Sequence, residues 1–418
     1  MKKLLLISPM LHQGGFERVC VATARLLEQY YKVTILIFSD KDINYDITGL
    51  DVVNIDVPVT KKFGRLGKAL NVFKRVSKVR RFKKKNDIDI AYSFGTSANL
   101  VNVLSKGGNK TKVVTGIRCS TDMETPKFVS MFCKKSDSVL SCSREILREL
   151  EKDYDCKESR YIYNPLETKS IRQSALLKDD LLSVKDQFGN GALTDVGNEK
   201  DSKEKPFTIV TVGRQDYIKG YWHLIKAFSI VHESFPDSRL VIVGTGDFSS
   251  FRKLSEDLGI AEKVFFTGVL KNPFPVVEDS DLYVLSSNHE GFPNALLEGM
   301  ALSKPCVAAD CKTGPREILL NDKEYKALSE KIPDGSSTSE IIEGEFGILV
   351  PDMDCNEDLD SKNITDDDRM LAKGILMMMS DKEKMELYGK KASVRAFVYD
   401  PSRYALDLKK ILDDILEK

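Results

Sequence analysis

Short apolar runs alternate with amphipathic segments of helical length from the start of the chain. In the first part of the sequence these runs predict strands at residues 3–8, 33–38, 88–93, 112–118 and 138–141. Residues 17–30 carry apolar positions at helical spacing and predict an amphipathic helix. Near-continuous apolar strands separated by helices are typical of a parallel sheet that is covered on both faces. The first part therefore predicts a doubly wound α/β domain.

The alternation stops after Asn164-Pro165 and starts again at Phe207. Residues 167–205 are polar and contain Gly189, Gly191 and Gly197, so they predict a linker with one short helix near 176–184. The second part predicts strands at 207–212, 239–244, 263–267, 281–286, 305–309 and 346–350, and helices at 221–235, 249–258, 294–302 and 316–320. Residues 321–345 are mostly polar and predict a long loop, a polar excursion of the chain between a helix and a strand.

These patterns predict two Rossmann-like domains, residues 1–166 and 206–380, that face each other across a cleft. Three helical patterns close the chain, at 368–380, 382–398 and 401–416. We expect residues 381–418 to cross back to the first domain. Ligands of open parallel sheets bind beyond the carboxyl ends of the strands, so the loops that follow the strands are the candidate sites.

Composition favours a globular enzyme of two domains. The chain has 418 residues, of which 42% are hydrophobic and 30% charged. The first apolar run is too short for a signal peptide, and no apolar stretch reaches the ~18 residues of a membrane-spanning helix. The eight cysteines form no Cys-x-x-Cys pair, which favours reduced thiols in a cytoplasmic protein over disulfides or zinc.

The net charge of zero hides an asymmetry between the two parts. Residues 1–150 carry 27 Lys and Arg against 14 Asp and Glu, and residues 61–85 alone carry twelve basic side chains and no acidic one. An apolar stripe runs through this segment and predicts a helix that packs on the sheet and presents a basic face. Anionic lipids attract such a face, and nothing in the sequence resembles a nucleic-acid motif. We expect docking on the inner face of the cytoplasmic membrane through Lys74, Arg75, Lys78, Arg81, Lys83, Lys84 and Lys85.

Two loops at strand ends carry candidate phosphate-binding groups. After the first strand, His12 precedes Gly14-Gly15, whose backbone amides are suited to an anion at a helix start. After the first strand of the second domain, Arg214 and Lys219 offer two cations for a diphosphate. Each motif alone is also typical of an ordinary tight turn or a solvated charged loop.

A third loop, residues 287–300, carries two glutamates in an apolar setting. Glu290 follows the strand, Asn294 is a candidate N-cap, and Glu298 lies one turn inside the next helix. Glu298 is suited to accept hydrogen bonds from two neighbouring ribose hydroxyls. The remaining candidates for donor contacts are Gly291, Phe292, Pro293 and Asn294.

The ordered set of Gly14-Gly15, Arg214, Lys219, Glu290 and Glu298 resembles the retaining GT-B glycosyltransferases of the large family-four group. The resemblance implies that Glu290 lies against the donor sugar, that Glu298 binds the ribose, and that Arg214 and Lys219 bind the diphosphate of a nucleotide sugar. The Gly14-Gly15 loop would donate amides to the same diphosphate. Residues 310–317 look like the loop of members that act on bacterial surface polysaccharides and lipid-linked oligosaccharides.

The chain departs from many relatives at residues 92–97, where a histidine is often found near the reacting sugar. A subgroup that this chain resembles has an arginine at the end of the next strand, so the resemblance makes Arg118 a candidate for acceptor or phosphate contacts. His12, in the first motif loop, is the other candidate. No cluster with metal-ligand spacing is visible, so we expect a metal-independent transferase without a cofactor, in which Arg214, Lys219 and backbone amides stabilise the leaving group. The expected donor is a UDP-sugar carrying a hexose or N-acetylhexosamine.

Two other functions compete with this interpretation. A sugar-nucleotide epimerase also uses two facing domains, and it would act without an acceptor. A non-catalytic partner of another transferase would keep the fold and lose the chemistry, but the presence of both cations and both glutamates argues against it.

Overall fold

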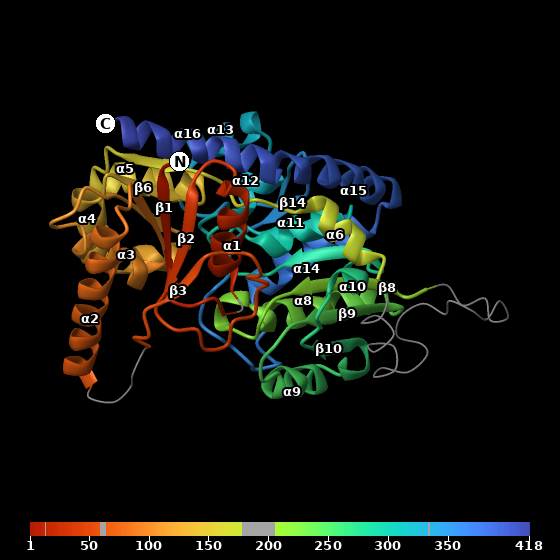
Figure 1. Cartoon of the computed structure of the whole chain (residues 1–418). Helices are drawn as coiled ribbons and strands as arrows, with labels where there is room; N and C mark the ends of the chain where they lie inside the picture. Colours follow the sequence, from red (N-terminus) through yellow and green to blue (C-terminus); the bar gives the residue numbers. More distant parts are fainter. Residues whose placement is uncertain (13, 59–63, 178–204, 333–334) are drawn as a thin grey trace. The chain divides into compact units, whose positions relative to one another are not determined.

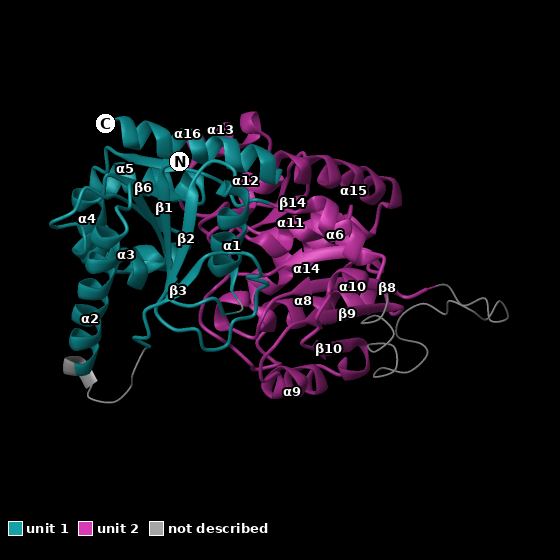
Figure 2. Cartoon of the chain, in the orientation of Figure 1, with its two compact units in different colours: residues 1–165, 399–418 teal, residues 166–398 magenta. Residues whose placement is uncertain are grey.

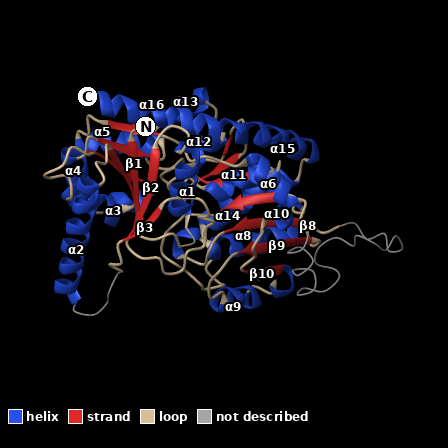
Figure 3. Ribbon diagram, in the orientation of Figure 1, coloured by secondary structure: helices blue, strands red, loops and turns tan. Residues whose placement is uncertain are grey.

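The computed structural model describes residues 1–12, 14–58, 64–177, 205–332 and 335–418, with only the backbone for 64–66. The chain divides into two compact units (Figure 2). Unit 1 comprises Met1–Pro165 and Tyr399–Lys418, and unit 2 comprises Leu166–Val398. Each unit is built on one sheet with helices packed against it (Figures 1 and 3).

Unit 1 contains a parallel sheet in the order β3-β2-β1-β4-β5-β6-β7. Its strands are β1 (Lys3–Ser8), β2 (Lys32–Ile37), β3 (Val52–Asn54), β4 (Ile90–Phe94), β5 (Lys112–Ile117), β6 (Ser138–Ser141) and β7 (Ser159–Tyr161). Its helices are α1 (Gly15–Leu27), α2 (Gly64–Lys85), α3 (Thr96–Leu104), η1 (Ser120–Glu124), α4 (Pro126–Lys135), α5 (Arg144–Tyr154) and α16 (Pro401–Glu417). Leu4 and Leu6 belong to a core cluster with α1 and α16, whereas Leu5 and Ile7 belong to another with α2 and α3. This division explains why β1 is apolar at successive positions.

Unit 2 contains a second sheet in the order β10-β9-β8-β11-β12-β14-β13, parallel except for the pair β13–β14. Its strands are β8 (Phe207–Val212), β9 (Ser238–Val243), β10 (Val264–Gly268), β11 (Leu282–Leu285), β12 (Cys306–Ala309), β13 (Ile342–Glu343) and β14 (Ile348–Val350). Its helices are α6 (Thr168–Ala175), η2 (Tyr217–Lys219), α8 (Tyr221–Ser234), α9 (Ser249–Asp257), η3 (Ala261–Lys263), α10 (Phe274–Glu278), α11 (Asn294–Ala301), α12 (Pro315–Leu319), α13 (Asp322–Lys331), α14 (Asp366–Met379) and α15 (Lys382–Ala396). A short helix, η4 (Phe397–Tyr399), lies where the chain passes from unit 2 to unit 1.

The doubly wound α/β architecture predicted from the apolar runs is confirmed, and the differences concern short or polar elements. The edge strands β3, β7 and β13 were not expected, nor was α13 within the polar excursion. Helix α6 lies within the segment that was predicted to be a linker. It packs against α10 and α11 and therefore belongs to unit 2. The helix expected near 176–184 falls mostly outside the described residues.

The return of the chain to unit 1 begins later than expected. Residues 381–398 were predicted to belong to the crossing segment, but α15 packs against α11 and stays with unit 2. Only Tyr399–Lys418 joins unit 1. Within the described part of the chain, no helix has the length and apolar character needed to cross a membrane.

Candidate functional site

The loop after β8 brings Lys219 to the carboxyl end of the sheet of unit 2. The chain passes through η2 and reaches Gly220, whose φ is +57° and whose Cβ, if present, would lie 2.2 Å from the carbonyl oxygen of Ser286. No side chain fits there, so glycine allows the loop after β8 to touch the end of β11. Two hydrogen bonds hold this contact, from the Ser286 hydroxyl to the carbonyl of Lys219 at 2.9 Å and from the Asn288 amide to the carbonyl of Ile218 at 3.0 Å.

Lys219 and Glu290, which the sequence nominated independently, are in direct contact. The Lys219 Nζ donates to the Glu290 Oε1 at 2.7 Å, and the two side chains are 18% and 11% exposed. The hydroxyl of buried Thr313, in the loop after β12, donates to the backbone carbonyl of Glu290. Three loops at the carboxyl ends of β8, β11 and β12 therefore meet around Glu290.

Arg214 takes a different partner within its own loop. Its Nη2 lies 3.1 Å from the Asp216 Oδ2, and 59% of its side chain is exposed. Asp216 also caps η2 by accepting a hydrogen bond from the Ile218 amide at 3.4 Å. The contact of Arg214 with a donor diphosphate remains a prediction.

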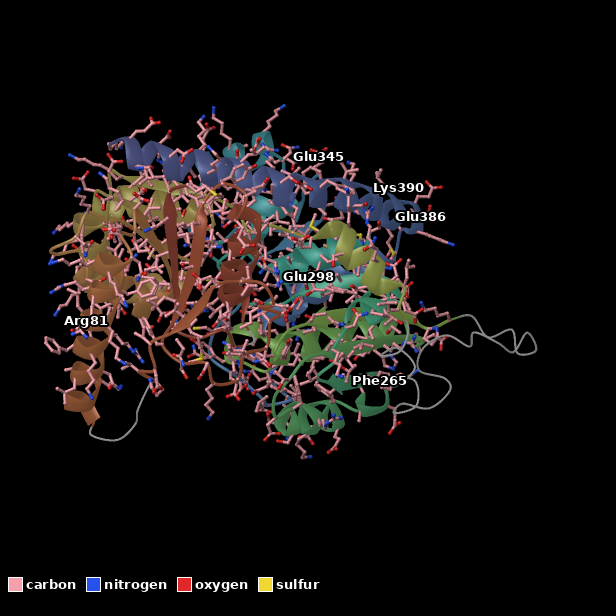
Figure 4. All side chains as sticks on the ribbon, in the orientation of Figure 1. Arg81, Phe265, Glu298, Glu345, Glu386 and Lys390 are labelled. Atoms are coloured by element: carbon pink, nitrogen blue, oxygen red, sulfur yellow. The ribbon has the colours of Figure 1, made fainter. Side chains whose placement is uncertain are left out.

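Glu298 is buried in α11, as its apolar surroundings predicted (Figure 4). The adjacent Gly299 packs on the ring of Tyr283, and a Cβ there would lie 2.7 Å from the ring. The expectation that Asn294 caps α11 is wrong: Pro293 occupies the cap position and Asn294 is the first helical residue. Proline suits this boundary because its φ is preset and it lacks the N–H that a helix start leaves unbonded.

The loop after β12 packs against the loop of residues 287–300. Gly314 has a φ of +99°, and a Cβ there would lie 2.5 Å from the Cδ of Pro293. The buried Arg316 braces this loop with two hydrogen bonds to Asp310, at 2.8 and 2.6 Å, and one to the carbonyl of Ser336 at 2.8 Å. The sequence pointed to residues 310–317 through a family resemblance alone. The ion pair of Asp310 with Arg316 could have been predicted from the sequence, because the two residues are six positions apart and Gly314 between them favours a turn.

The Gly14-Gly15 loop opens α1 in unit 1 as predicted, but Tyr45 already holds it. The Gly14 amide donates to the Tyr45 hydroxyl at 2.9 Å, and that hydroxyl donates to the Gly14 carbonyl at 2.6 Å. The carboxyl group of Glu17 folds back over the loop, 2.2 Å from where a Cβ of Gly14 would stand. His12 is exposed beside this loop. Sequence reasoning missed Tyr45, because nothing in its local pattern marks a contact with a loop more than thirty residues earlier.

Arg118 lies at the end of β5 and is buried within unit 1. Its Nη1 donates to the Tyr92 hydroxyl at 3.3 Å, and its Nη2 donates to the Asn164 Oδ1 at 2.6 Å. The guanidinium also lies 5.7 Å from the ring centre of Phe94. These contacts tie three segments of unit 1 together, and a role of Arg118 toward the acceptor remains a prediction.

Two of the seven basic residues assigned to the membrane face are in the core instead. Arg75 donates from Nε and Nη2 to the carbonyl of Val57, at 2.9 and 2.8 Å, and lies over the ring of Phe38. Lys83 is completely buried, and its Nζ donates to Asn102 and Ser105 at 2.7 to 3.0 Å. Their assignment to a bilayer contact is wrong because neither side chain reaches the surface. The other five of the seven are exposed, namely Lys74, Lys78, Arg81, Lys84 and Lys85, with Arg81 visible on α2 in Figure 4.

The apolar stripe of α2 is also only partly used by the core. Val79 is fully buried, whereas Leu70 and Phe73 are 60% and 72% exposed. The stripe was expected to face the sheet along its length. Instead the first part of α2 presents large apolar side chains and cations together on the surface.

Both halves of the chain match models of glycosyltransferase families. Residues 195–337 match "Glycosyl transferases group 1", and residues 13–170 match "Glycosyltransferase Family 4". An uncharacterized glycosyltransferase of Methanocaldococcus jannaschii is 33% identical over 186 residues, which is 44% of this chain and 44% of that protein. A 4-alpha-N-acetylgalactosaminyltransferase of Campylobacter jejuni, named for a diphospho-undecaprenol-linked substrate, is 25% identical over 99% of this chain and 100% of that protein.

The fold has close counterparts among solved structures. The structure of Anabaena HepE in complex with UDP aligns with 99% of this chain and 100% of its own, with a TM-score of 0.70 and 16% identity. At that identity the likeness shows the fold alone, and that fold is GT-B. The two family matches show that this chain belongs to the group 1, family-four glycosyltransferases, and its fold is GT-B.

Proposed function

We propose that this chain is a metal-independent, retaining glycosyltransferase that moves a hexose or N-acetylhexosamine from a UDP-sugar to a lipid-linked or polysaccharide acceptor of surface-glycan synthesis. The observation that carries the proposal is the contact of Lys219 with Glu290 at the carboxyl ends of β8 and β11. That edge is where open parallel sheets bind nucleotides, and the two residues combine a cation for phosphate with a carboxylate for sugar hydroxyls.

In this proposal the donor phosphates lie on Lys219 and Arg214. As the bond between the anomeric carbon and the phosphate oxygen breaks, negative charge grows on the departing diphosphate and the cations stabilise it. The acceptor oxygen bonds to the anomeric carbon on the face that the phosphate leaves, and its proton passes to a departing phosphate oxygen. Glu290 lies beside the sugar and Glu298 accepts from the ribose hydroxyls. No cofactor takes part.

A relative of similar length supports the proposed acceptor class. The Campylobacter jejuni protein is named for a diphospho-undecaprenol-linked acceptor, and the alignment covers both chains almost completely. A glycan on such a lipid carrier is presented at a membrane, which fits the exposed cations and apolar side chains of α2. We therefore propose that the protein works at the inner face of the cytoplasmic membrane and binds no nucleic acid.

Thermal unfolding with a panel of nucleotide sugars tests the donor. We expect UDP-sugars to raise the melting temperature, because a ligand at 100 times its Kd stabilises the folded state by about 2.7 kcal/mol. With the right donor and a polyprenyl-diphosphate glycan, UDP should be released in the presence of EDTA, and Lys219→Ala should lower turnover by about 10²–10³. Lys271→Ala, in the loop after β10, is the matched control.

Each competing function has its own signature in this assay. An epimerase would convert the UDP-sugar to an isomer without any acceptor. A non-catalytic partner would bind the donor and release no UDP with any acceptor. Abolition of turnover by EDTA, with rescue by Mn²⁺, would contradict the metal-independent mechanism.

A further inference from the structure

Both cations that the proposed function assigns to the donor diphosphate already have a carboxylate partner in the chain. Lys219 contacts Glu290 at 2.7 Å, and Arg214 contacts Asp216 at 3.1 Å. A diphosphate that binds these cations must compete with two intramolecular anions. The two pairs differ in a way that makes the competition measurable.

The pair Arg214–Asp216 is open to water, with side-chain exposures of 59% and 24%. Exposed pairs of this kind contribute little to stability, since water and salt screen them. The pair Lys219–Glu290 is more enclosed, at 18% and 11%. Its attraction is stronger in this less polar setting, and its separation by a ligand costs correspondingly more.

The backbone around Glu290 is fixed while its side chain is held only at the tip. The Thr313 hydroxyl donates to the Glu290 carbonyl, and the Glu290 carboxylate contacts Lys219 through Oε1. Burial and, to a smaller extent, the charge of Glu290 raise the pKa of the Tyr221 hydroxyl. Burial also raises the pKa of the Cys311 thiol, and the charges of Asp352, Glu290 and Asp310 add to this effect. Lys219 acts on the same thiol in the opposite direction, and its ammonium group is in contact with the Glu290 carboxylate.

We propose that Glu290 is the internal counter-ion of Lys219 in the empty site and that the donor diphosphate displaces it. The inference rests on the proposed function, in which Lys219 binds the diphosphate. Displacement lowers the donor affinity, because part of the phosphate–lysine attraction replaces the existing ion pair. It also means that the Glu290 carboxylate becomes available to the sugar only when the diphosphate is in place. Glu290 is therefore a positioning and gating residue as well as a contact of the sugar.

The test is titration calorimetry of UDP with wild-type protein and the isosteric variant Glu290→Gln. We expect UDP to bind Glu290→Gln about fivefold more tightly, the factor that corresponds to an ion pair of about 1 kcal/mol. Turnover of the same variant should fall, so affinity and rate move in opposite directions. Uridine, which has no phosphate, should bind both proteins equally.

Two further variants identify the partner. In the Lys219→Met background, Glu290→Gln should leave the UDP affinity unchanged, because the cation for which the two anions compete is gone. Asp216→Asn keeps the cap of η2 and should change UDP affinity by less than about twofold, as for an exposed pair. Glu290→Ala serves as a second probe if Glu290→Gln is poorly folded, and it should also tighten UDP binding.

Equal or weaker UDP binding by both Glu290 variants would overturn the inference. So would an equal gain in uridine affinity, because that would show a general rearrangement and no competition for Lys219. Absence of UDP and GDP binding by the wild-type protein is a different result, and it would count against the proposed function itself.

Discussion

Asp352, two residues after β14, is a partly buried carboxyl group near other acidic side chains. Its Oδ1 accepts a hydrogen bond from the Met353 amide at 2.9 Å. Burial, with the nearby charges of Asp310 and Asp367, raises the pKa of Asp352 to about 7, against 3.8 for the free group. Because the folded pKa is the higher one, the folded state holds a proton that the unfolded chain has lost. This stabilising contribution is complete below about pH 4 and is lost as the pH rises to 7.

Asp352→Asn should therefore stabilise the protein only at high pH. At about pH 8.5 the free energy of unfolding in urea should rise by about 1–3 kcal/mol, and at about pH 4 the variant should match the wild type. Asp354→Asn is the control, since hydrogen bonding from the Asn356 amide lowers the pKa of the exposed Asp354. That variant should give no stabilisation at high pH. An equal effect of Asp352→Asn at both pH values would contradict the argument.

Helix α2 is the element whose surface role can be tested by itself. Lys74, Arg81, Lys84 and Lys85 are exposed, and Phe73 is exposed among them. The cations should attract anionic lipid headgroups by about 1 kcal/mol each, and Phe73 should enter the interface. Sedimentation with vesicles should rise with anionic lipid content and fall with salt. Replacing the four cations by glutamine should weaken sedimentation strongly and leave UDP affinity unchanged.

A matched pair of variants separates this surface from the core of α2. Phe73→Ser should weaken vesicle binding without loss of stability, because the ring is exposed. Lys83→Met and Lys84→Gln each remove one lysine amine, but the Lys83 amine is buried and donates three hydrogen bonds. Lys83→Met should change stability and leave vesicle binding intact. Equal binding of the wild type to neutral and anionic vesicles would contradict the electrostatic docking.

At the scale of the whole molecule, the chain closes unit 1 with its last helix. Five residues of α16 are buried in the core that contains β1 and α1, namely Tyr404, Ala405, Leu408, Leu412 and Ile415. The Tyr404 and Thr23 hydroxyls are 2.7 Å apart, and the Tyr31 hydroxyl donates to Asp413 at 2.6 Å. Unit 1 is therefore completed by residues that are far from the rest of it in sequence.

Leu408→Ala should destabilise unit 1 by about 2–5 kcal/mol, the usual effect of a buried leucine replaced by alanine. The exposed Leu406 on the same helix is the control, and Leu406→Ala should have little effect. UDP binding should survive in both variants, because Lys219, Glu290 and Glu298 lie in unit 2. Urea unfolding followed with and without UDP checks both points. Loss of UDP binding in Leu408→Ala would show that the donor residues depend on unit 1.

The sequence alone determined the architecture because burial on two faces leaves a strong local signal. Strands β1, β6 and β8 have the bounds that were predicted from their apolar runs. The strands that were missed, β3, β7 and β13, have two or three residues each and are less buried, so hydrophobicity marks them weakly. Helix α13 carried a capping box, Asn321 with Glu324, which its polar composition obscured.

Only the tertiary structure decided which charged residues lie together at the candidate site. The spacing of residues nominated Lys219 and Glu290 separately, but their contact spans 71 positions and depends on the close approach of Gly220 to Ser286. In α2 the local sequence shows only that Lys83 and Lys84 are neighbouring cations. One is enclosed by acceptors of Asn102 and Ser105, and the other faces solvent. A local pattern records the preferences of a segment for burial, whereas a partner for a charge comes from another segment, and only folding brings the two together.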